Sequence, residues 1–462
     1  MNNLHGDNNN NNNNNSRQNS GITMPYHRRL FTTTNNYAFY EIAENNDMKP
    51  TTRKLADALT GSSTILATSP SPFLSEEKQK IAEIRQRRFA LAKAITLVES
   101  TAPTHRHQAD LLLTHILTES VLQNNSSAST VTTDNKDENQ SPKSFSPPSP
   151  SSFRLGIAGP PGAGKSTFIE TFGLYILNDL ARTTNNSSSS TNHNTNDDND
   201  DEDDPSPFVP HKMAVVCIDP SSTVTGGSIL GDKTRMTELS KHERAYVRPS
   251  ANGGTFGGLS AYTHDVVSLC QAADYELVIV ESVGLGQSEV EIAESVDMLV
   301  LIVPPGGGDE LQGVKKGIVE VADLLLVNKA DGKFQQAARS TAIDYRGAIH
   351  YKRQLSDAWP TTPILLTSAH TGEGIAEVWE QICKYRYLMS KSGELEEKRR
   401  SQARYWMWKN LKDLIIAKSH NDPVLRPKAD AMVAALDSGA ITPRVAAKEV
   451  LDFITTNGVY LH

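Results

Sequence analysis

The sequence predicts an α/β fold in which a mostly parallel sheet is flanked by helices. From Phe153 onward, short apolar runs of strand length alternate with stretches of helical periodicity. This alternation is typical of βα units and a parallel sheet. A glycine-rich turn, Gly159–Ser166, directly follows the first apolar run. The expected strands are Leu155–Ala158, Met213–Ile218, Leu277–Glu281, Met298–Val303, Leu324–Val327 and Ile364–Thr367.

The chain changes character twice before this domain begins. Residues 1–75 are dominated by Asn, Ser, Thr and Pro, and we expect them to be mostly disordered. Apolar residues then recur at three- and four-residue spacing in Glu76–Leu97, and a second helical stretch covers His107–Leu122. These two stretches predict a small helical hairpin ahead of the main domain.

The first part of the chain also has the composition of an import signal. The stretch Met24–Tyr40 contains two Arg, several hydroxyl side chains and no acidic residue. This composition is typical of a mitochondrial transit peptide. A disordered tail that happens to be basic is the alternative interpretation.

After about residue 390 the strand pattern stops. Gly393–Lys418 is expected to form one long charged helix with an apolar stripe. Pro423 and Pro427 are expected to break it, and shorter helices are predicted at Lys428–Leu436 and Thr442–Thr456. The predicted parts are a disordered or targeting segment 1–75, an N-terminal helical extension 76–122, a low-complexity linker 123–152, an α/β domain 153–390 with a disordered insert 183–210, and a C-terminal helical region 391–462.

Composition argues against several classes of protein. The formal net charge is −8, which does not suggest general nucleic-acid binding. No apolar run approaches the ~20 residues that a membrane-spanning helix needs. The three cysteines, Cys217, Cys270 and Cys383, lack C-x-x-C spacing, so we expect reduced thiols rather than disulfides or a zinc site. Neither a nucleic acid nor a membrane is therefore an expected partner.

The glycine-rich turn matches the phosphate-binding motif G-x-x-x-x-G-K-[ST]. Glycines let backbone N–H groups turn toward phosphate oxygens, and the following helix adds its N-terminal dipole. Lys165 would supply a cation to the β- and γ-phosphates, and Ser166 a hydroxyl to Mg²⁺. The predicted nucleotide-binding residues of this loop are Gly159, Pro160, Pro161, Gly162, Ala163, Gly164, Lys165, Ser166 and Thr167.

A second motif, N-K-x-D, begins at Asn328 directly after a predicted strand. Asp331 can accept hydrogen bonds from the ring N–H and exocyclic amine of guanine, whereas adenine would leave this carboxylate unpaired. Asn328 would brace the loop, and the stem of Lys329 would cover the base. Ser368 and Ala369 end the last predicted strand and resemble the S-A element whose backbone N–H contacts the guanine carbonyl. GTP is therefore the expected substrate.

Two acidic residues at strand ends are candidates for holding Mg²⁺. Asp219 follows the second predicted strand, and Glu281 ends the third at the position of the D-x-x-G motif of most GTPases. A helix-cap or turn role is the alternative for each. The N–H of Gly284 would sense the γ-phosphate, but Leu285 stands where many GTPases carry a water-orienting Gln. We therefore expect slow intrinsic hydrolysis that a partner accelerates.

The stretches between these motifs resemble MeaB/ArgK-type GTPases. The resemblance covers about Glu76 to the C-terminus, apart from the two low-complexity inserts. It is specific because residues outside the general GTPase motifs match as well. The matching stretches are Gly159–Thr167, Asp219–Ser222, Gly226–Met236, Glu281–Glu289, Gly308–Lys316 and Asn328–Gly332.

This resemblance implies a function that motif spacing cannot show. Members of the family are G-protein chaperones of adenosylcobalamin-dependent methylmalonyl-CoA mutase, and they gate cofactor loading and help eject damaged cofactor. Their eukaryotic members are mitochondrial, which implies a location in the matrix. They are homodimers, held partly by a C-terminal helical extension that Gly393–Ile415 resembles.

The resemblance also assigns roles to the loops. Gly226–Met236 looks like the first switch of the family, Gly284–Glu289 like the second, and Gly306–Lys316 like an additional one. In the additional loop, Lys315 or Lys316 could supply transition-state charge once a partner orders it. The candidate catalytic residues are Lys165, Asp309, Lys315 and Lys316.

Three other readings stay open at this point. A nickel-enzyme metallochaperone GTPase would need thiol or imidazole ligands, and no His-rich tract or Cys cluster is present. A small-molecule kinase-like P-loop enzyme would need an acceptor site, of which no signature is visible. A purely structural nucleotide-binding module would show no change in hydrolysis when a partner is added.

Overall fold

A computed structural model describes residues 47–61, 76–100, 102–128, 152–180, 208–219, 236–251, 261–282, 291–306, 316–350 and 356–456. The chain divides into two compact units, Met1–Lys49 and Pro50–His462. All the helices and strands below belong to the second unit. Most of the expected linker 123–152 and of the expected insert 183–210 lies outside the described residues.

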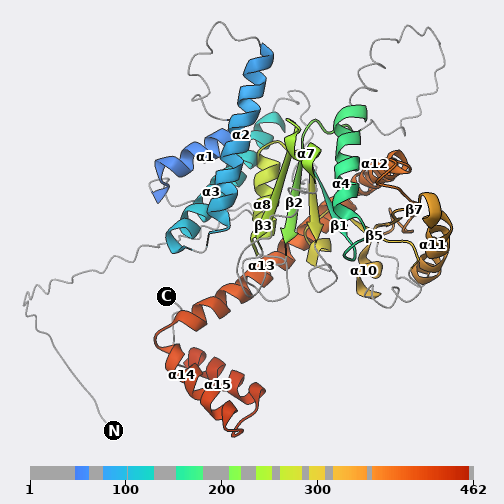
Figure 1. Ribbon diagram of the computed structural model, residues 1–462. Helices are drawn as coiled ribbons and strands as arrows, with labels where there is room; N and C mark the ends of the chain where they lie inside the picture. The colour runs from blue at the N-terminus through green and yellow to red at the C-terminus, as the bar shows by residue number, and fades with distance from the viewer. Residues whose placement is uncertain are drawn as a thin grey trace, which may run out of the picture. The chain divides into compact units, whose positions relative to one another are not determined.

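A parallel sheet of seven strands forms the centre of this unit (Figure 1), in the order β3-β2-β4-β1-β5-β6-β7. Every neighbouring pair is parallel. The carboxyl ends of the strands therefore lie along one edge of the sheet, which we call the carboxyl edge. The strands are β1 Phe153–Ala158, β2 Met213–Asp219, β3 Ala245–Ala251, β4 Leu277–Ser282, β5 Met298–Val303, β6 Leu324–Val327 and β7 Ile364–Leu366.

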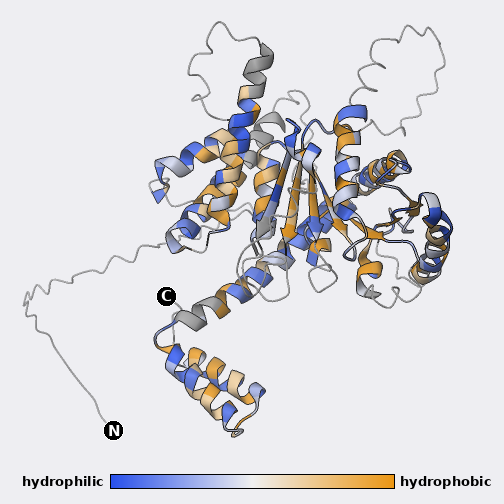
Figure 2. Cartoon of the chain, in the orientation of Figure 1, coloured by the Kyte–Doolittle hydropathy of each residue, from blue (hydrophilic) through white to orange (hydrophobic). Residues whose placement is uncertain are grey.

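The central strands are mostly apolar because both faces of the sheet are covered, and the exceptions are Arg154 in β1 and Glu281 and Ser282 at the end of β4. Every residue of β1, β4 and β5 is buried, and Figure 2 shows the hydrophobic colouring of these strands. Alternate residues enter two separate cores: Val278 and Val280 face one, and Leu277 and Ile279 face the other. The apolar pattern of these strands thus reflects burial from two sides.

Each face of the sheet is covered by its own set of helices. The side of Val278 packs against α8, α10 and α11, and the side of Leu277 packs against α4, α7 and α12. These elements are α4 Lys165–Leu174, which η3 Tyr175–Leu180 continues, α7 Thr237–Lys241, α8 Ala261–Ala272, α10 Lys316–Val321, η4 Gly332–Phe334, α11 Gln335–His350 and α12 Ile375–Ser392.

All the expected strands are present, with ends that differ by at most two residues. The strand β3 was not expected. Its sequence contains Pro249, which lacks an N–H donor and argues against a strand inside a sheet. The proline is tolerated because β3 lies at one edge of the sheet, and among the described strands it pairs with β2 alone.

The N-terminal helices are α1 Pro50–Thr60, α2 Glu76–Val98 and α3 Pro103–Ala128. Residues 1–75 were expected to be mostly disordered, and α1 is a helix within this range that was not expected. Its buried residues Thr52, Ala56 and Leu59 lie on one face, and the Thr52 hydroxyl donates to Gln108 Oε1 at 2.9 Å. A helix of 11 residues is too short to be stable by itself in water. Packing against α2 and α3 therefore supplies the stability of α1.

The C-terminal helices are α13 Glu394–Asn421, α14 Leu425–Asp437 and α15 Pro443–Thr456. Pro427 was expected to lie before the next helix. It lies instead in the first turn of α14, where a missing N–H costs little. The Asp422 carboxylate accepts from the N–H groups of Val424 and Leu425 at this start. In the described part of the chain, no helix is long and apolar enough to span a membrane.

Candidate functional site

The glycine-rich loop joins β1 to α4 at the carboxyl edge. Gly159, Gly162 and Gly164 have φ angles of 149°, 80° and 90°, which side-chain-bearing residues rarely adopt. A Cβ atom on Gly159 would lie 2.0 Å from the carbonyl oxygen of Ile302, and one on Gly164 would lie 2.6 Å from Asn328 Nδ2. Both glycines are therefore required by close approach as well as by φ.

Lys165 is the first residue of α4, and its ammonium group folds back over the loop. Its Nζ donates to the carbonyl oxygens of Gly159 at 2.7 Å and Pro160 at 3.2 Å, and the residue is only 8% exposed. A buried cation needs such acceptors. These carbonyls hold one positive charge inside the loop, next to the backbone that the glycines shape.

A hydroxyl and a carboxylate meet beside the loop. Ser166 Oγ donates to Glu281 Oε1 at 2.9 Å, and Glu281, near the end of β4, is 2% exposed. Asp219 ends the neighbouring strand β2, whose register places Cys217 opposite Glu281. Nothing is described of the Asp219 side chain. Oxygen atoms of this kind are the ligands that Mg²⁺ prefers, so the donor set at this edge fits that ion.

The N-K-x-D loop follows β6 and is tied to the phosphate-binding loop by one buried amide. Asn328 Nδ2 donates to the Ala163 carbonyl oxygen at 2.9 Å, and Asn328 Oδ1 accepts from the Ala369 N–H at 3.1 Å. Asn328 itself is 1% exposed. This single side chain thus joins three loops that are far apart in the sequence.

The other residues of this motif also contact neighbouring loops. Lys329 has a φ of 58°, and its Nζ donates to the Gly162 carbonyl oxygen at 2.6 Å. Ser368 Oγ donates to Asp331 Oδ1 at 2.9 Å. The backbone is fixed as well, because the Ala330 N–H donates to the Thr367 carbonyl oxygen at 2.9 Å. These contacts set the carboxylate of Asp331 next to the 368–369 turn.

The structure therefore brings most of the sequence-predicted site residues together at the carboxyl edge. Gly284, Asp309 and Lys315 lie outside the described residues, and only the backbone of Lys316, at the start of α10, is described. The residues that meet are Gly159, Pro160, Pro161, Gly162, Ala163, Gly164, Lys165, Ser166, Thr167, Glu281, Asn328, Lys329, Asp331, Ser368 and Ala369.

Two residues of this region were missed by sequence reasoning. Thr171, on α4, donates its hydroxyl to the Ala369 carbonyl oxygen at 2.7 Å and so ties the 368–369 turn to the helix. Gly374 precedes α12 with a φ of 80°, and a Cβ there would lie 2.4 Å from the Leu366 carbonyl oxygen. The two closely spaced glycines Gly372 and Gly374 could have indicated a tight turn at this point of the sequence. No feature of the sequence indicates a role for Thr171.

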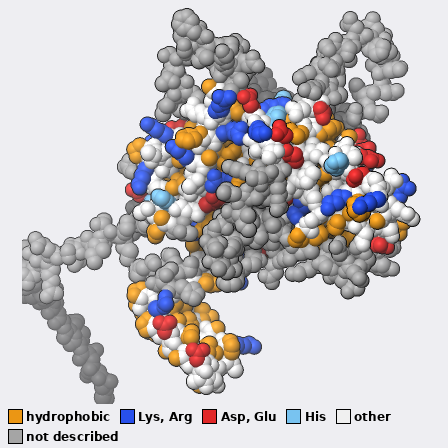
Figure 3. All heavy atoms as spheres, viewed as in Figure 1, with side chains coloured by type: hydrophobic (Ala, Val, Ile, Leu, Met, Phe, Trp, Pro, Cys, Tyr) orange, Lys and Arg blue, Asp and Glu red, His pale blue; other side chains and the backbone are white. Residues whose placement is uncertain are grey.

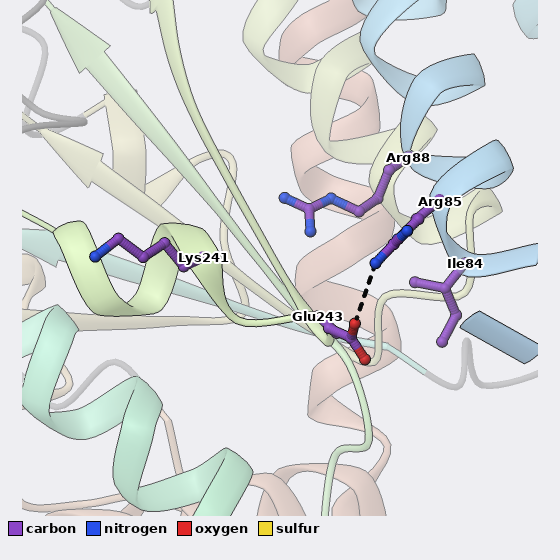
Figure 4. A pocket seen from close by; sticks show the side chains of 5 residues that line it. All are labelled: Ile84, Arg85, Arg88, Lys241 and Glu243. Atoms are coloured by element: carbon purple, nitrogen blue, oxygen red, sulfur yellow. Dashed lines mark ion pairs between the residues drawn. The ribbon is translucent and has the colours of Figure 1, made fainter. Parts of the chain in front are cut away.

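A separate small cavity lies between α2 and the turn that joins α7 to β3 (Figure 4). It encloses about 130 Å³ and is lined by Ile84, Arg85, Arg88, Lys241 and Glu243. Figure 4 shows Arg85 directed at Glu243, and their charged atoms are 3.6 Å apart. A nucleotide needs a pocket of roughly 300 Å³ or more. None of the lining residues belongs to a nucleotide motif, so we do not place the substrate there.

A phosphate-binding loop with its lysine, a strand-end carboxylate and an N-K-x-D loop on a parallel sheet define a P-loop GTPase. Residues 209–423 match the model of a family described as methylmalonyl Co-A mutase-associated GTPase MeaB. The chain belongs to this MeaB/ArgK family of GTPases.

Individual relatives agree with this assignment. The chain is 36% identical over 387 residues to the mitochondrial methylmalonic aciduria type A homolog of Mus musculus, covering 82% of this chain and 80% of the relative. It is 34% identical over 379 residues to GTPase ArgK of Escherichia coli K12, covering 82% and 96%. The crystal structure of an LAO/AO transport system kinase is 28% identical with a TM-score of 0.53, covering 83% of this chain and all of that one.

Proposed function

We propose that this GTPase is a G-protein chaperone of methylmalonyl-CoA mutase, which gates loading of adenosylcobalamin and protects or reactivates the mutase. The matched family is described as mutase-associated, and the mouse relative is named for methylmalonic aciduria. The observation that carries the proposal is the contact of Asn328 with both the phosphate-binding loop and the 368–369 turn. It supports an intact guanine-nucleotide site in a chain of this family.

In this proposal, residues 159–167 hold the phosphates of GTP. The glycines bring backbone N–H groups close to the phosphate oxygens, and the charge of Lys165 stabilises the β- and γ-phosphates. Ser166, Asp219 and Glu281 would hold Mg²⁺, directly or through water. The ion would supply positive charge to the phosphate oxygens when it is bound.

Selection of guanine falls to the loop after β6. Asp331 accepts from the guanine ring N–H and amine, and the hydrogen bond from Ser368 fixes the orientation of this carboxylate. Asn328 holds the loop against the phosphate-binding loop, and the stem of Lys329 lies over the base. The Ala369 N–H donates to Asn328 Oδ1 and the Ser368 N–H to the Glu373 carbonyl oxygen, so the 368–369 turn would have to share or exchange one of these hydrogen bonds to contact the guanine carbonyl oxygen.

Hydrolysis is proposed to be slow until the mutase binds. Gly284 would contact the γ-phosphate, with no Gln directly after it in the sequence. Asp309, Lys315 and Lys316 are proposed to complete the catalytic charge when the partner orders their loop. In this proposal, residues 159–167 bind the nucleotide, and binding of the partner orders residues 306–316.

Two further features complete the proposal. The helix α13 exposes large apolar side chains, among them Met407 and Trp408, the latter 65% exposed. Figure 3 shows hydrophobic side chains gathered on the C-terminal helices. We propose that region 391–462 forms a homodimer through this surface. The Met24–Tyr40 stretch, outside the described residues, is proposed to direct the chain to the mitochondrial matrix. The name of the mouse relative, which says that it is mitochondrial, supports import into this organelle.

The first experiment measures GTP hydrolysis by the purified chain with and without methylmalonyl-CoA mutase. We expect turnover below about 1 s⁻¹ alone, the low end for enzymes, and acceleration of ten-fold or more by the mutase. Lys165→Ala is the control, because it removes the charge from the phosphate-binding loop and should abolish both rates. Unchanged turnover with the mutase would leave a GTPase but rule out this partner.

A further inference from the structure

The small cavity between α2 and the turn from α7 to β3 carries more positive than negative charge. Arg85 and Arg88 reach it from α2, where their spacing of three residues puts them on one side of the helix. Glu243 is the single carboxylate of the lining. The ammonium group of Lys241 pairs with Glu238 at 2.8 Å, and in Figure 4 it points away from Arg88. The two arginines of α2 are therefore the cations that face the cavity.

Only one of these two arginines has a carboxylate partner among the described residues. Arg85 forms a loose ion pair with Glu243, with charged atoms 3.6 Å apart and both side chains more than half exposed. In the same part of the chain, the one hydrogen bond of Arg88 is a 3.5 Å contact with the His242 carbonyl oxygen. Figure 4 shows its guanidinium group extended from α2 toward the side of α7. The positive charge of Arg88 thus lines the cavity without a counter-ion in the described chain.

The α2 wall of the cavity is fixed to the sheet domain. Arg87, which lies between the two cavity arginines, forms an ion pair with Asp274, directly ahead of β4. Just beyond the end of α2, Glu99 Oε2 accepts from Arg248 Nη2 of β3 at 2.6 Å. The buried side of α2, which includes Leu91, belongs to the same core as α8. These contacts hold the backbone of α2 in place beside the sheet.

The opposite wall is fixed to α4. The Glu238 N–H at the start of α7 donates to Glu170 Oε1 at 2.8 Å. Leu239 is fully buried against Gly173, where an added Cβ atom would lie 2.9 Å from the leucine side chain. Because both walls are held by contacts outside the cavity, a ligand would have to order side chains but not backbone, which lowers the cost of binding.

The size and charge of the cavity fit a phosphate group. Its volume of about 130 Å³ has room for several groups of water size, each of which needs roughly 10–15 Å³. The planar fork of a guanidinium group matches the oxygens of phosphate. A phosphate group carries a charge of about −1.5 to −2 at pH 7, more than a carboxylate. It would therefore compete with Glu243 for Arg85 and supply the acceptor that Arg88 lacks.

We propose that this cavity is a binding site for a phosphate group, separate from the nucleotide site and held by Arg88 and Arg85. The ligand is inorganic phosphate or the terminal phosphate of a small phosphorylated molecule. Once bound, it joins α2 to the turn between α7 and β3. Because the ligand contacts two elements that are brought together by folding, it stabilises the folded chain by mass action.

The first test titrates the full chain with inorganic phosphate in a calorimeter. The chain is saturated with GDP and Mg²⁺, so that the nucleotide site is filled, and chloride keeps the ionic strength constant. We expect saturable binding. Arg88→Ala should weaken it ten-fold or more, because charge-assisted hydrogen bonds to the phosphate are lost. Arg53→Ala removes an exposed arginine of α1 and should leave the affinity unchanged.

Glu243→Gln distinguishes a ligand site from a purely structural ion pair. The substitution removes the carboxylate that competes for Arg85, so the affinity for phosphate should rise a few-fold. Loss of a structural ion pair alone would not raise it. Absence of saturable phosphate binding by the GDP-bound wild type would overturn the proposal, and so would equal affinities of the wild type and Arg88→Ala.

A second titration identifies the source of the phosphate group. Tighter binding of glycerol 3-phosphate than of inorganic phosphate would assign the site to a phosphorylated small molecule, and the reverse order would assign it to the free ion. Thermal unfolding of the GDP-bound chain gives an independent measurement. The midpoint should rise with the concentration of the preferred ligand in the wild type and in Arg53→Ala, but not in Arg88→Ala.

Discussion

Two buried polar junctions lie in the sheet domain, and they are built in opposite ways. The Asn328 junction, at the carboxyl edge, is a neutral amide that hydrogen-bonds to two backbone groups, the Ala163 carbonyl oxygen and the Ala369 N–H. The Asp297 junction, ahead of β5, is a fully buried carboxylate that accepts from the guanidinium groups of Arg154 and Arg399. The backbone carbonyl of Asp297 also accepts from Tyr385 and Lys398.

The difference shows how charge is divided in this protein. At the Asp297 junction one buried carboxylate is hydrogen-bonded to two guanidinium groups, so its charge is used within the protein. At the carboxyl edge the neutral Asn328 amide joins the loops, and charged side chains such as Lys165 and Asp331 lie beside the loops that would hold GTP. One junction fixes helices to the sheet, and the other positions a site.

The largest effect is expected from breaking the charged junction. Asp297→Ala would leave two buried guanidinium groups without their carboxylate, which should lower the free energy of unfolding by about 3–5 kcal/mol. Urea denaturation at pH 7 measures this loss. Lys412→Ala, an exposed change, should be neutral. A loss below about 1 kcal/mol would mean that solvent already screens the pair.

The same junction should be visible in the pH dependence of stability. Burial alone would raise the pKa of the Asp297 carboxyl, but the Arg154 and Arg399 guanidinium groups outweigh it and hold that pKa well below its usual range. A depressed carboxyl pKa gives stability that is present above the unfolded value, near 3.8, and is lost as pH falls below it. Asp297→Ala should therefore flatten the acid limb of the stability curve.

The neutral junction should give a smaller loss of stability but a larger loss of function. Asn328→Ala removes the partners of the Ala163 carbonyl and the Ala369 N–H, which should cost about 1–3 kcal/mol in unfolding free energy. Because the same change frees two loops of the nucleotide site, GTP affinity should fall by about 100-fold. Calorimetric titration with GTP measures it, and an unchanged affinity would contradict the bracing role.

The carboxylate of Asp265, on α8, sharpens the comparison because a second carboxylate, that of Asp110, lies near it in place of a pair of guanidinium groups. Burial and the nearby Asp110 carboxylate raise the pKa of Asp265 to about 7, and Arg106 opposes this only in part. Stability from this group is present at low pH and is lost as pH rises from the unfolded value toward 7. Asp265→Asn should therefore stabilise the chain at pH 8 by roughly 2 kcal/mol, with no gain at pH 4. Thermal unfolding at the two pH values checks this.

The smallest effect is expected at Thr171. Thr171→Val keeps the shape of the side chain but removes its hydrogen bond to the Ala369 carbonyl oxygen. Removal of this hydrogen bond should reduce the free energy of guanine-nucleotide binding by about 1 kcal/mol, which corresponds to a few-fold higher dissociation constant. Thr114→Val is the control, because Thr114 is exposed on α3 and its hydroxyl donates to the Asp110 carbonyl oxygen of the same helix. Equal effects of both changes on GTP affinity would argue against a specific role for the 368–369 turn.

The parts of the fold that were predicted correctly are those in which local pattern and burial agree. β5 and β6 are short apolar runs, each preceded by an Asp and followed by Pro304 and Asn328 respectively, and their ends were found without error. β3 and α1 were missed because each depends on a neighbour. β3 tolerates Pro249 only as an edge strand, and α1 is stabilised by packing against α2 and α3.

The candidate site divides in the same way. Motif residues such as Lys165 and Asn328 could be found because phosphate and guanine recognition require fixed residue types at fixed spacing. Thr171 and Gln402, on α13, could not, because their contacts join positions far apart in the chain.

The sequence by itself determined the class of this protein. Loop chemistry such as that of Gly159–Ser166 depends on residues that are adjacent in the chain, and a parallel sheet buried on both faces leaves a plain apolar pattern. Only the tertiary structure decided which distant groups meet. The partners of Asp297 and the contacts of α13 with 291–297 arise from packing, and many sequences could satisfy the same buried charge or carbonyl.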